Sequence, residues 1–196
     1  MSKITSSRFI KMKRMRSGQM RWSGAGLDSQ LFFGGSLCST RKHRHARPLS
    51  TRHPIHLVLR SSKAQGAQSF WHRQNKLFVQ NCLRKYSARF GIQVLNCANV
   101  GNHLHLLMKL GNRFTYEKFI RAFSAAISLR LTKWNKNKGL RTEKFWDFRP
   151  YSRVVVGQRN ILTMKDYISI NQLEGLGCDR LQARMILAEQ KARERV

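Results

Sequence analysis

The chain has 196 residues, of which 41% are hydrophobic, and carries 38 Lys and Arg against 9 Asp and Glu, a formal net charge of +29. This length supports one ordinary hydrophobic core, so we expect one domain with tails and no second full domain. So large a positive charge would repel the compact state unless a polyanion supplied counter-charge, which predicts a nucleic-acid partner.

Acidic residues are unevenly placed along the chain, because Asp28 is the only carboxylate before Glu117. A nuclease or transposase that works through three carboxylates and two metal ions needs acids on several core strands. The first half of the chain offers almost none, so this mechanism is disfavoured.

The cysteine spacing and the length of the apolar runs predict where in the cell the protein is found. The four cysteines are scattered without a Cys-x-x-Cys pair, so neither a zinc knuckle nor a disulfide framework is indicated, and we expect a cytoplasmic protein. No apolar run reaches the roughly 18 residues of a membrane-spanning helix, so we expect no membrane partner.

The first half of the chain predicts an arm followed by three strands and a helix. Residues 1–52 are basic with Gly and Ser clusters, and we expect a flexible N-terminal arm, either a solvated tail or a non-specific phosphate-binding segment. Apolar patterning predicts a strand over residues 53–60 and an amphipathic helix over residues 70–90. Residues 92–100 and 103–110 are predicted to form a hairpin with a tight turn between them.

The second half alternates helices with one strand. Helical spacing resumes over residues 114–134, with Thr115 as the expected N-cap. A strand is predicted over residues 145–156, a helix over residues 160–173, and a charged amphipathic helix over residues 179–196. This order predicts an α+β fold, a ferredoxin-like antiparallel sheet with helices on one face and an added helix.

Two histidines flank one apolar residue in His103-Leu104-His105, inside the run predicted to be a buried strand. Residues i and i+2 of a strand share a face, so both imidazoles would point to one side while Leu104 packs behind them. Adjacent buried histidines need polar partners, which makes them hard to explain as core residues. The spacing indicates half of a metal site; the alternative is a pair of partly exposed strand histidines.

The helix predicted over residues 160–173 offers the remaining groups. Tyr167 and Asn171 are four residues apart, so they share a helix face about one turn apart. The Asn171 amide oxygen suits a hard ion such as Mg²⁺ or Mn²⁺, and Tyr167 could attack a phosphate that this ion polarises. The alternative is that Tyr167 is a core aromatic residue beside Ile168 and Ile170.

These features resemble a known family. The order of elements, residues 101–107 (GNHLHLL), the Phe145-Trp146 pair and residues 167–171 (YISIN) look like those of the single-tyrosine HUH transposases. The closest resemblance is to the REP-associated tyrosine transposase-like (RAYT) proteins. It covers roughly residues 53–175, which we therefore expect to be an HUH transposase-like catalytic domain, with residues 176–196 as a C-terminal helix or tail.

The resemblance implies a domain that recognises a DNA hairpin and cuts the adjacent single strand. In that family the metal is held by the two motif histidines, here His103 and His105, and by a polar residue one turn past the tyrosine, here Asn171. The matching nucleophile is Tyr167. The sequence departs from the family at two sites. A glycine precedes Asn102 where a proline is common, and Gln172 follows Asn171 where a proline is also common.

The expected reaction depends on Mg²⁺ or Mn²⁺ and needs no nucleotide. Tyr167 attacks the phosphate in line, releases a 3′-hydroxyl and forms a 5′-phosphotyrosine link, and a 3′-hydroxyl can reverse this step to give strand transfer. Lys165 and His56 are candidates for helping the Tyr167 phenol to lose its proton, and we assign no general base. Such a transposase or nickase would bind hairpin-bearing single-stranded DNA as a monomer or a homodimer.

Basic and aromatic side chains of the central domain are candidates for DNA contact, the former with phosphates and the latter by stacking on unpaired bases. They are Arg60, Arg84, Lys85, Arg121, Arg130, Lys133, Lys136, Lys138, Arg149 and Arg153, with Trp146 or Phe148 as the stacking residue. Two other functions remain open: a catalytically silent protein that binds hairpin DNA without cutting it, and a basic RNA-binding protein.

Overall fold

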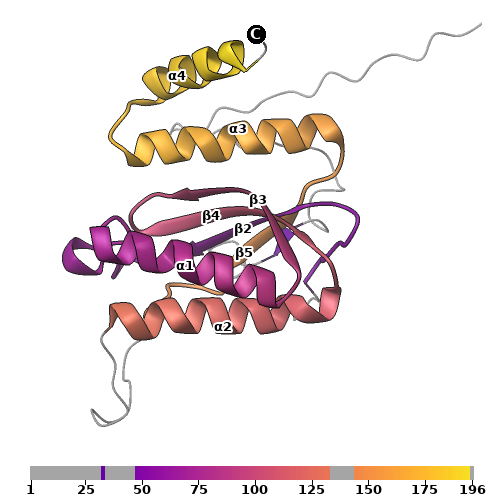
Figure 1. The fold of residues 1–196 in the computed structure, drawn as a ribbon, viewed down its shortest axis with the longest axis vertical. Coiled ribbons are helices and arrows are strands. Elements are labelled where there is room, and N and C mark those ends of the chain that lie inside the picture. The colour runs from indigo at the N-terminus through magenta and orange to yellow at the C-terminus, as the bar shows by residue number, and fades with distance from the viewer. Residues whose placement is uncertain (1–31, 34–46, 133–143, 195–196) are drawn as a thin grey trace, which may run out of the picture.

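The computed structural model describes residues 32–33, 47–132 and 144–194 (Figure 1). Most of the predicted arm at residues 1–52 lies outside the described residues. The elements in chain order are β1 (Phe32–Phe33), β2 (Ile55–Arg60), a 3-10 turn (Gly66–Gln68), α1 (Arg73–Arg89), β3 (Ile92–Asn99), β4 (His103–Leu110), α2 (Arg113–Leu131), β5 (Tyr151–Val154), α3 (Gln158–Gly175) and α4 (Arg180–Arg193).

The strands form one antiparallel sheet in the order β1-β5-β2-β4-β3. Without the two-residue β1, the chain runs strand, helix, strand, strand, helix, strand, which is the order of a ferredoxin-like sheet. The predicted fold class is therefore confirmed.

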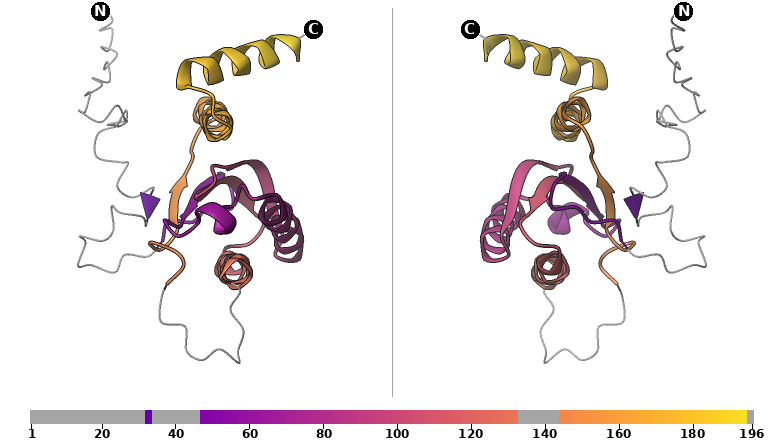
Figure 2. Two further views of the ribbon diagram at one scale, coloured as in Figure 1. Left: turned by 90° about the vertical axis from the view of Figure 1, so that its left-hand side faces the viewer. Right: turned by 90° about the vertical axis from the view of Figure 1, so that its right-hand side faces the viewer.

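Helices cover both faces of the sheet. Figures 1 and 2 show α1 and α2 on one face and α3 on the other, with α4 stacked on α3 away from the sheet. The capping box of Asp179 and Gln182 begins α4, and buried Ala183 packs the helix inward. An ion pair of 2.6 Å between Lys191 and Asp166 joins α4 to α3. The C-terminal helix is thus a packing element of this domain.

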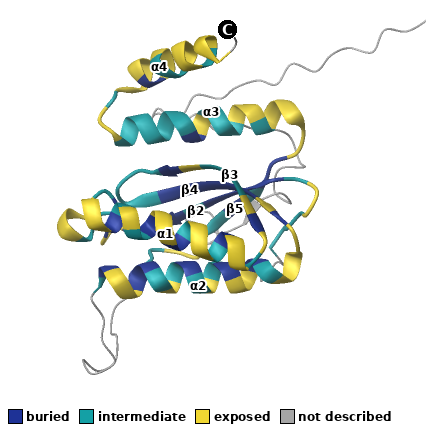
Figure 3. Ribbon diagram, in the orientation of Figure 1, coloured by how far each residue is buried: buried dark blue, intermediate teal, exposed yellow. Residues whose placement is uncertain are grey.

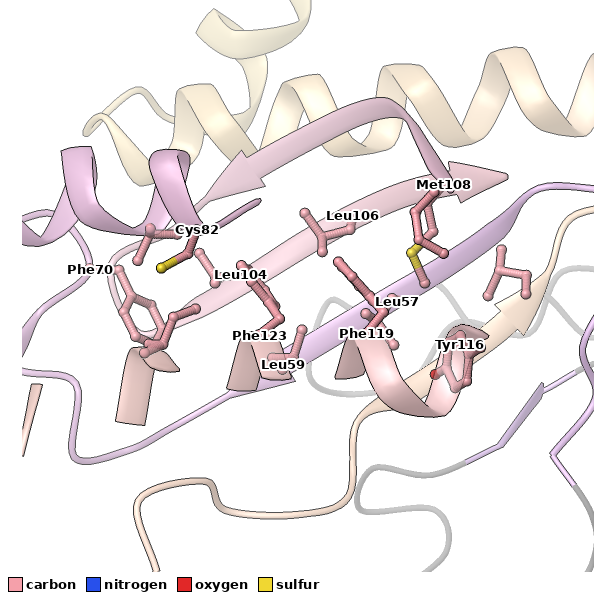
Figure 4. Packing of buried hydrophobic residues seen from close by; sticks show 14 of the residues in the cluster. Leu57, Leu59, Phe70, Cys82, Leu104, Leu106, Met108, Tyr116, Phe119 and Phe123 are labelled. Carbon is pink, nitrogen blue, oxygen red and sulfur yellow. The ribbon is translucent and has the colours of Figure 1, made fainter. Parts of the chain in front are cut away.

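Strand alternation in β4 divides the apolar residues between two cores. Leu104, Leu106 and Met108 pack with α1 and α2 in the main core (Figure 4), whereas Leu107 joins Ile168 of α3 in a smaller core on the other face. Figure 3 shows the central strands buried beneath both helical layers. The residues of β4 between the main-core positions therefore face α3.

The strand predicted over residues 145–156 is shorter, and the predicted N-cap of α2 is wrong. Residues 144–150 form a loop in which Asp147 accepts hydrogen bonds from the Ser62 backbone N–H and hydroxyl, both 2.8 Å, and Phe145 is buried in the main core. Pro150 has no N–H for a strand ladder, so β5 begins after it. At α2 the Asn112 side chain caps the helix by accepting from a backbone N–H in the first turn.

No helix within the described ranges combines the length and the apolar character needed to cross a bilayer.

Candidate active site

The two motif histidines lie on the sheet face that α3 covers. His103 begins β4 and is half-buried, while His105 lies two residues further along the strand and is 4% exposed. Their ring centroids are 4.8 Å apart. Leu104 between them packs into the main core on the opposite face. The strand places both imidazoles on one side, as the alternation in the sequence predicts.

Tyr167 on α3 lies beside His105. Its ring centroid is 5.7 Å from that of His105, in an edge-to-face arrangement with an interplanar angle of 78°. Tyr167 is 39% exposed, so it lies at the surface of the domain and not in the core. The alternative that Tyr167 is a core aromatic residue is contradicted, because it is Ile168 that is fully buried against the sheet.

A third histidine belongs to the same cluster, and sequence reasoning gave it no such place. His56 on β2 is 5% exposed, and its Nε2 lies 3.0 Å from Nδ1 of His105 in a hydrogen bond. The two rings are nearly parallel, with centroids 5.3 Å apart. His56 is also 6.0 Å from the Tyr167 ring. The only signal in the sequence was a histidine on the polar face of an otherwise apolar strand.

Among the motif histidines, one buried ring nitrogen has no hydrogen-bond partner among the described residues. His103 Nδ1 lies 2.7 Å from Oδ1 of Asn102, which accepts from it when that nitrogen carries the proton. His105 Nε2 is buried without a hydrogen-bond partner among the described residues. A buried nitrogen with no partner costs free energy unless another group, such as a metal ion, occupies its lone pair.

All three imidazoles are held in the neutral form. Burial, with the positive charge of Arg153, lowers the pKa of His56 to about 4. Burial lowers the pKa of His105 further, to about 2, and the neighbouring His56 and His103 add to the effect. Burial and Arg60 also lower the pKa of His103. Neutral imidazole is the form that coordinates metal ions, so the site suits a divalent cation.

The donor set that fits such an ion is two imidazoles and an oxygen ligand. No group of three or more His, Cys, Asp or Glu side chains in the described part of the chain is arranged to hold a metal. A third protein ligand must then be an amide or hydroxyl. Asn171, one turn after Tyr167, donates its Nδ2 to the Tyr167 carbonyl oxygen at 2.6 Å, a bond that does not use its own Oδ1. Oδ1 of Asn171 is therefore not engaged by this bond, and its coordination of an ion stays a prediction.

Polar bonds fix α3 over the sheet. Asn96 of β3 donates to the Lys165 carbonyl at 3.1 Å and to the Ser169 hydroxyl at 3.2 Å. Gln172 accepts from the backbone N–H of Asn99 at 2.7 Å. The glutamine that stands in place of the family's proline thus ties the helix of Tyr167 to the edge strand of the same chain.

The second departure from the family pattern is also explained. Gly101 in the turn between β3 and β4 has φ +86°, a conformation that proline cannot adopt because its ring fixes φ near −65°. A Cβ atom at this position would lie 2.6 Å from Cδ1 of Trp71. The turn that leads into the histidine strand is therefore built around glycine and the Trp71 ring.

The predicted DNA-contacting residues fall into separate groups. Arg60 and Arg153 lie on the site face, where they are register partners of His103 and His56. Arg84, Lys85, Arg121 and Arg130 lie on α1 and α2, which cover the opposite face. DNA bound at the histidines would reach them only by wrapping around the sheet.

Of the remaining predicted contacts, the described ones lie in the loop before β5. Lys133, Lys136 and Lys138 lie outside the described residues. Arg149 and Phe148 are exposed, whereas Trp146 packs against the main core and donates its Nε1 to the Ser124 carbonyl oxygen at 3.1 Å. Phe148 is therefore the better placed of the two aromatic side chains to stack on a base.

Comparisons with known proteins bear on both the family and the fold. The family model of IS200-like transposases matches residues 50–171. A solved REP-associated tyrosine transposase bound to a REP hairpin is similar in fold, with a TM-score of 0.51, 12% identity and coverage of 67% of this chain and 73% of that one. A structure described as a transposase from Deinococcus radiodurans R1 gives a TM-score of 0.39 at 16% identity, covering 68% of this chain and 98% of that one. No curated protein matches the chain.

Proposed function

The chain belongs to the IS200-like transposase family, and we propose that it is a metal-dependent HUH endonuclease that binds DNA hairpins, cuts the adjacent single strand and rejoins strands through a 5′-phosphotyrosine intermediate. The observation that carries the proposal is the position of Tyr167, whose ring lies 5.7 Å from that of His105. Tyr167 comes from a helix and His105 from a strand far from it in the sequence, so no spacing pattern relates them. In the fold, the proposed nucleophile lies beside neutral imidazoles.

The chemistry assigned to Tyr167 is a transesterification. The phenolic oxygen attacks phosphorus, the new bond to the tyrosine forms as the bond to the 3′-oxygen breaks, and the departing 3′-oxygen takes up a proton. The number of phosphate ester bonds is unchanged, so no nucleotide is consumed. Attack by a 3′-hydroxyl on the phosphotyrosine reverses the step and joins strands, which is the chemistry that transposition requires.

A divalent ion, Mg²⁺ or Mn²⁺, would supply charge neutralisation at the phosphate when bound. His103 and His105 would hold it through Nε2, and Asn171 through Oδ1. Arg60 and Arg153, which flank the histidines, would contact the phosphates on either side of the scissile bond. These contacts position the strand and leave recognition of its sequence to other residues.

The partner we propose is single-stranded DNA that carries a hairpin. The REP-associated tyrosine transposase of similar fold is bound to a REP hairpin, which supports this choice. The histidines, Tyr167 and the bonds that fix α3 all belong to one chain, so a monomer contains every proposed catalytic group. A homodimer is compatible with the same site.

The test is covalent capture. Labelled hairpin-bearing single strands are incubated with the protein and Mn²⁺ or Mg²⁺, denatured, and separated to detect a protein-linked product. We expect an adduct with the wild type, no adduct with Tyr167→Phe or in the presence of a chelator, and unchanged hairpin binding by Tyr167→Phe.

Tyr86→Phe is the matched control, since this tyrosine lies on α1 across the sheet and should still form the adduct. If the wild type binds hairpins across varied sequences and never forms an adduct, the protein is a silent hairpin-binding protein. A preference for RNA that is indifferent to chelators would instead indicate an RNA-binding protein.

A further inference from the structure

His56 has a contact that the proposed reaction does not use. It lies on β2, next to β4 in the sheet, and the register pairs His56 with Leu107 and Val58 with His105. The two histidines are therefore diagonal neighbours on the face beneath α3. Their nitrogens, Nε2 of His56 and Nδ1 of His105, lie 3.0 Å apart, and both side chains are buried.

One of these two nitrogens must carry the proton, and the surroundings decide which. If His56 donated, His105 would carry its own proton on Nε2, a buried atom with no acceptor among the described residues. A buried N–H without an acceptor costs about 1–3 kcal/mol. If His105 donates from Nδ1 instead, its Nε2 keeps a lone pair, which a metal ion can occupy.

We propose that His56 is a positioning residue, which accepts the Nδ1 proton of His105 and thereby holds the Nε2 lone pair of His105 toward the metal. The inference rests on the proposed metal site and extends it to a residue behind the ligands. Hydrogen bonds to the far nitrogen of a ligating histidine set its tautomer and ring orientation. Asn102 bonds Nδ1 of His103 in the same way at 2.7 Å, so both imidazoles would present Nε2.

His56 is not itself a ligand in this arrangement. Its Nε2 points at Nδ1 of His105, the nitrogen on the side of the ring away from the free Nε2. The ion that Nε2 of His105 binds would thus lie beyond the His105 ring as seen from His56. The two rings are nearly parallel, at an interplanar angle of 7°, as expected when an N–H in the plane of one ring donates to the in-plane lone pair of the other.

The first experiment reads the tautomer directly and needs no metal. Long-range ¹H–¹⁵N NMR correlations of metal-free protein distinguish a histidine protonated on Nδ1 from one protonated on Nε2. We expect His105 to be protonated on Nδ1 in the wild type and to lose this preference in His56→Leu. A wild-type His105 protonated on Nε2 would overturn the proposal.

The second experiment measures Mn²⁺ affinity by electron paramagnetic resonance. We expect His56→Leu to bind Mn²⁺ about 10–100-fold more weakly, the usual effect of removing such a partner. His56→Gln, whose amide oxygen can accept the same proton, should restore most of the affinity. The control is His72→Leu, because His72 is exposed at the start of α1 and its side chain makes no cap bond.

The outcomes separate this inference from the proposed function. Absence of Mn²⁺ binding by the wild type contradicts the proposed metal site, while the NMR result still decides the His56 bond. If His56→Leu binds Mn²⁺ as tightly as the wild type does, the role proposed for His56 is wrong and the proposed metal site stands. If His56→Leu does not fold, the wild-type tautomer and the affinity of His56→Gln decide instead, and a large loss of affinity in a folded His56→Gln protein counts against the proposal.

Discussion

A single glycine fixes the turn from which the histidine strand begins. Gly101 has φ +86°, and the Trp71 ring fills the space where a side chain would start. Both facts concern the backbone before β4, so a change here displaces the strand on which His103 and His105 lie. Glycine in place of the family's proline therefore agrees with the positive φ of this turn and with the position of the Trp71 ring.

We expect Gly101→Ala to destabilise the protein by about 1–3 kcal/mol through the strained backbone alone, and by more because its Cβ would overlap Trp71. Urea unfolding measures the free energy. Gly91→Ala is the control, since Gly91 also has positive φ, at +62°, but a Cβ atom added there would meet nothing within 4 Å. Equal losses for the two variants would contradict the role given to Trp71.

At the scale of elements, α3 depends on few apolar contacts. The small core beneath it is built around Ile168, which is fully buried, with Leu107, Ala98 and Val155. The main core on the other face of the sheet is much larger. The helix that carries Tyr167 is therefore the part of the domain that we expect to open first.

Ile168→Ala should cost about 2–5 kcal/mol, as expected for a large side chain lost from a core. Because the small core is separate, the loss should appear as faster amide exchange in α3 with little change in α1. Leu162→Ala is the control on the same helix, since Leu162 is half exposed. Uniform loss of protection in both helices would show that α3 and the main core unfold as one unit.

Most elements were predictable because they follow local periodicity. The β4 bounds of His103–Leu110 agree with the predicted strand, and the fold class follows from the order of elements. Boundaries set by side-chain bonds were missed. Thr115 was expected to cap α2, but Asn112 caps it. The strand expected from residue 145 starts at Tyr151, after Pro150 and the loop in which Asp147 bonds to Ser62.

The site was only partly accessible to sequence reasoning. The shared face of His103 and His105 follows from strand alternation, and the common helix face of Tyr167 and Asn171 from helical spacing. The contact of His56 with His105 does not follow from either, because it depends on the register between β2 and β4. No local pattern in the sequence specifies a register between strands that lie more than forty residues apart.

At the scale of the whole molecule, the site is assembled within one chain. Asn96 and Gln172 join α3 to its own β3, which holds Tyr167 over the histidines of the same chain. Exchange of α3 between two copies would have to break these bonds and expose Ile168 before the same contacts could form with the partner.

A mixing experiment tests this arrangement. Tyr167→Phe and His105→Gln proteins, each inactive, are combined and assayed for the covalent adduct. If each site is built from one chain, the mixture stays inactive, because no chain contributes both groups. Restored activity in the mixture would show that Tyr167 reaches the histidines of a partner. A control confirms that both variants still bind the hairpin.

The central claim is that Tyr167 forms the covalent link to DNA, and peptide mapping of the trapped adduct tests it most directly. The wild-type protein is reacted with a hairpin-bearing single strand and Mn²⁺, digested with protease and nuclease, and analysed by mass spectrometry. The account predicts a nucleotide on the peptide that contains Tyr167, joined through its 5′-phosphate. A nucleotide on Tyr86, Tyr116 or Tyr151, or a link through a 3′-phosphate, would contradict it.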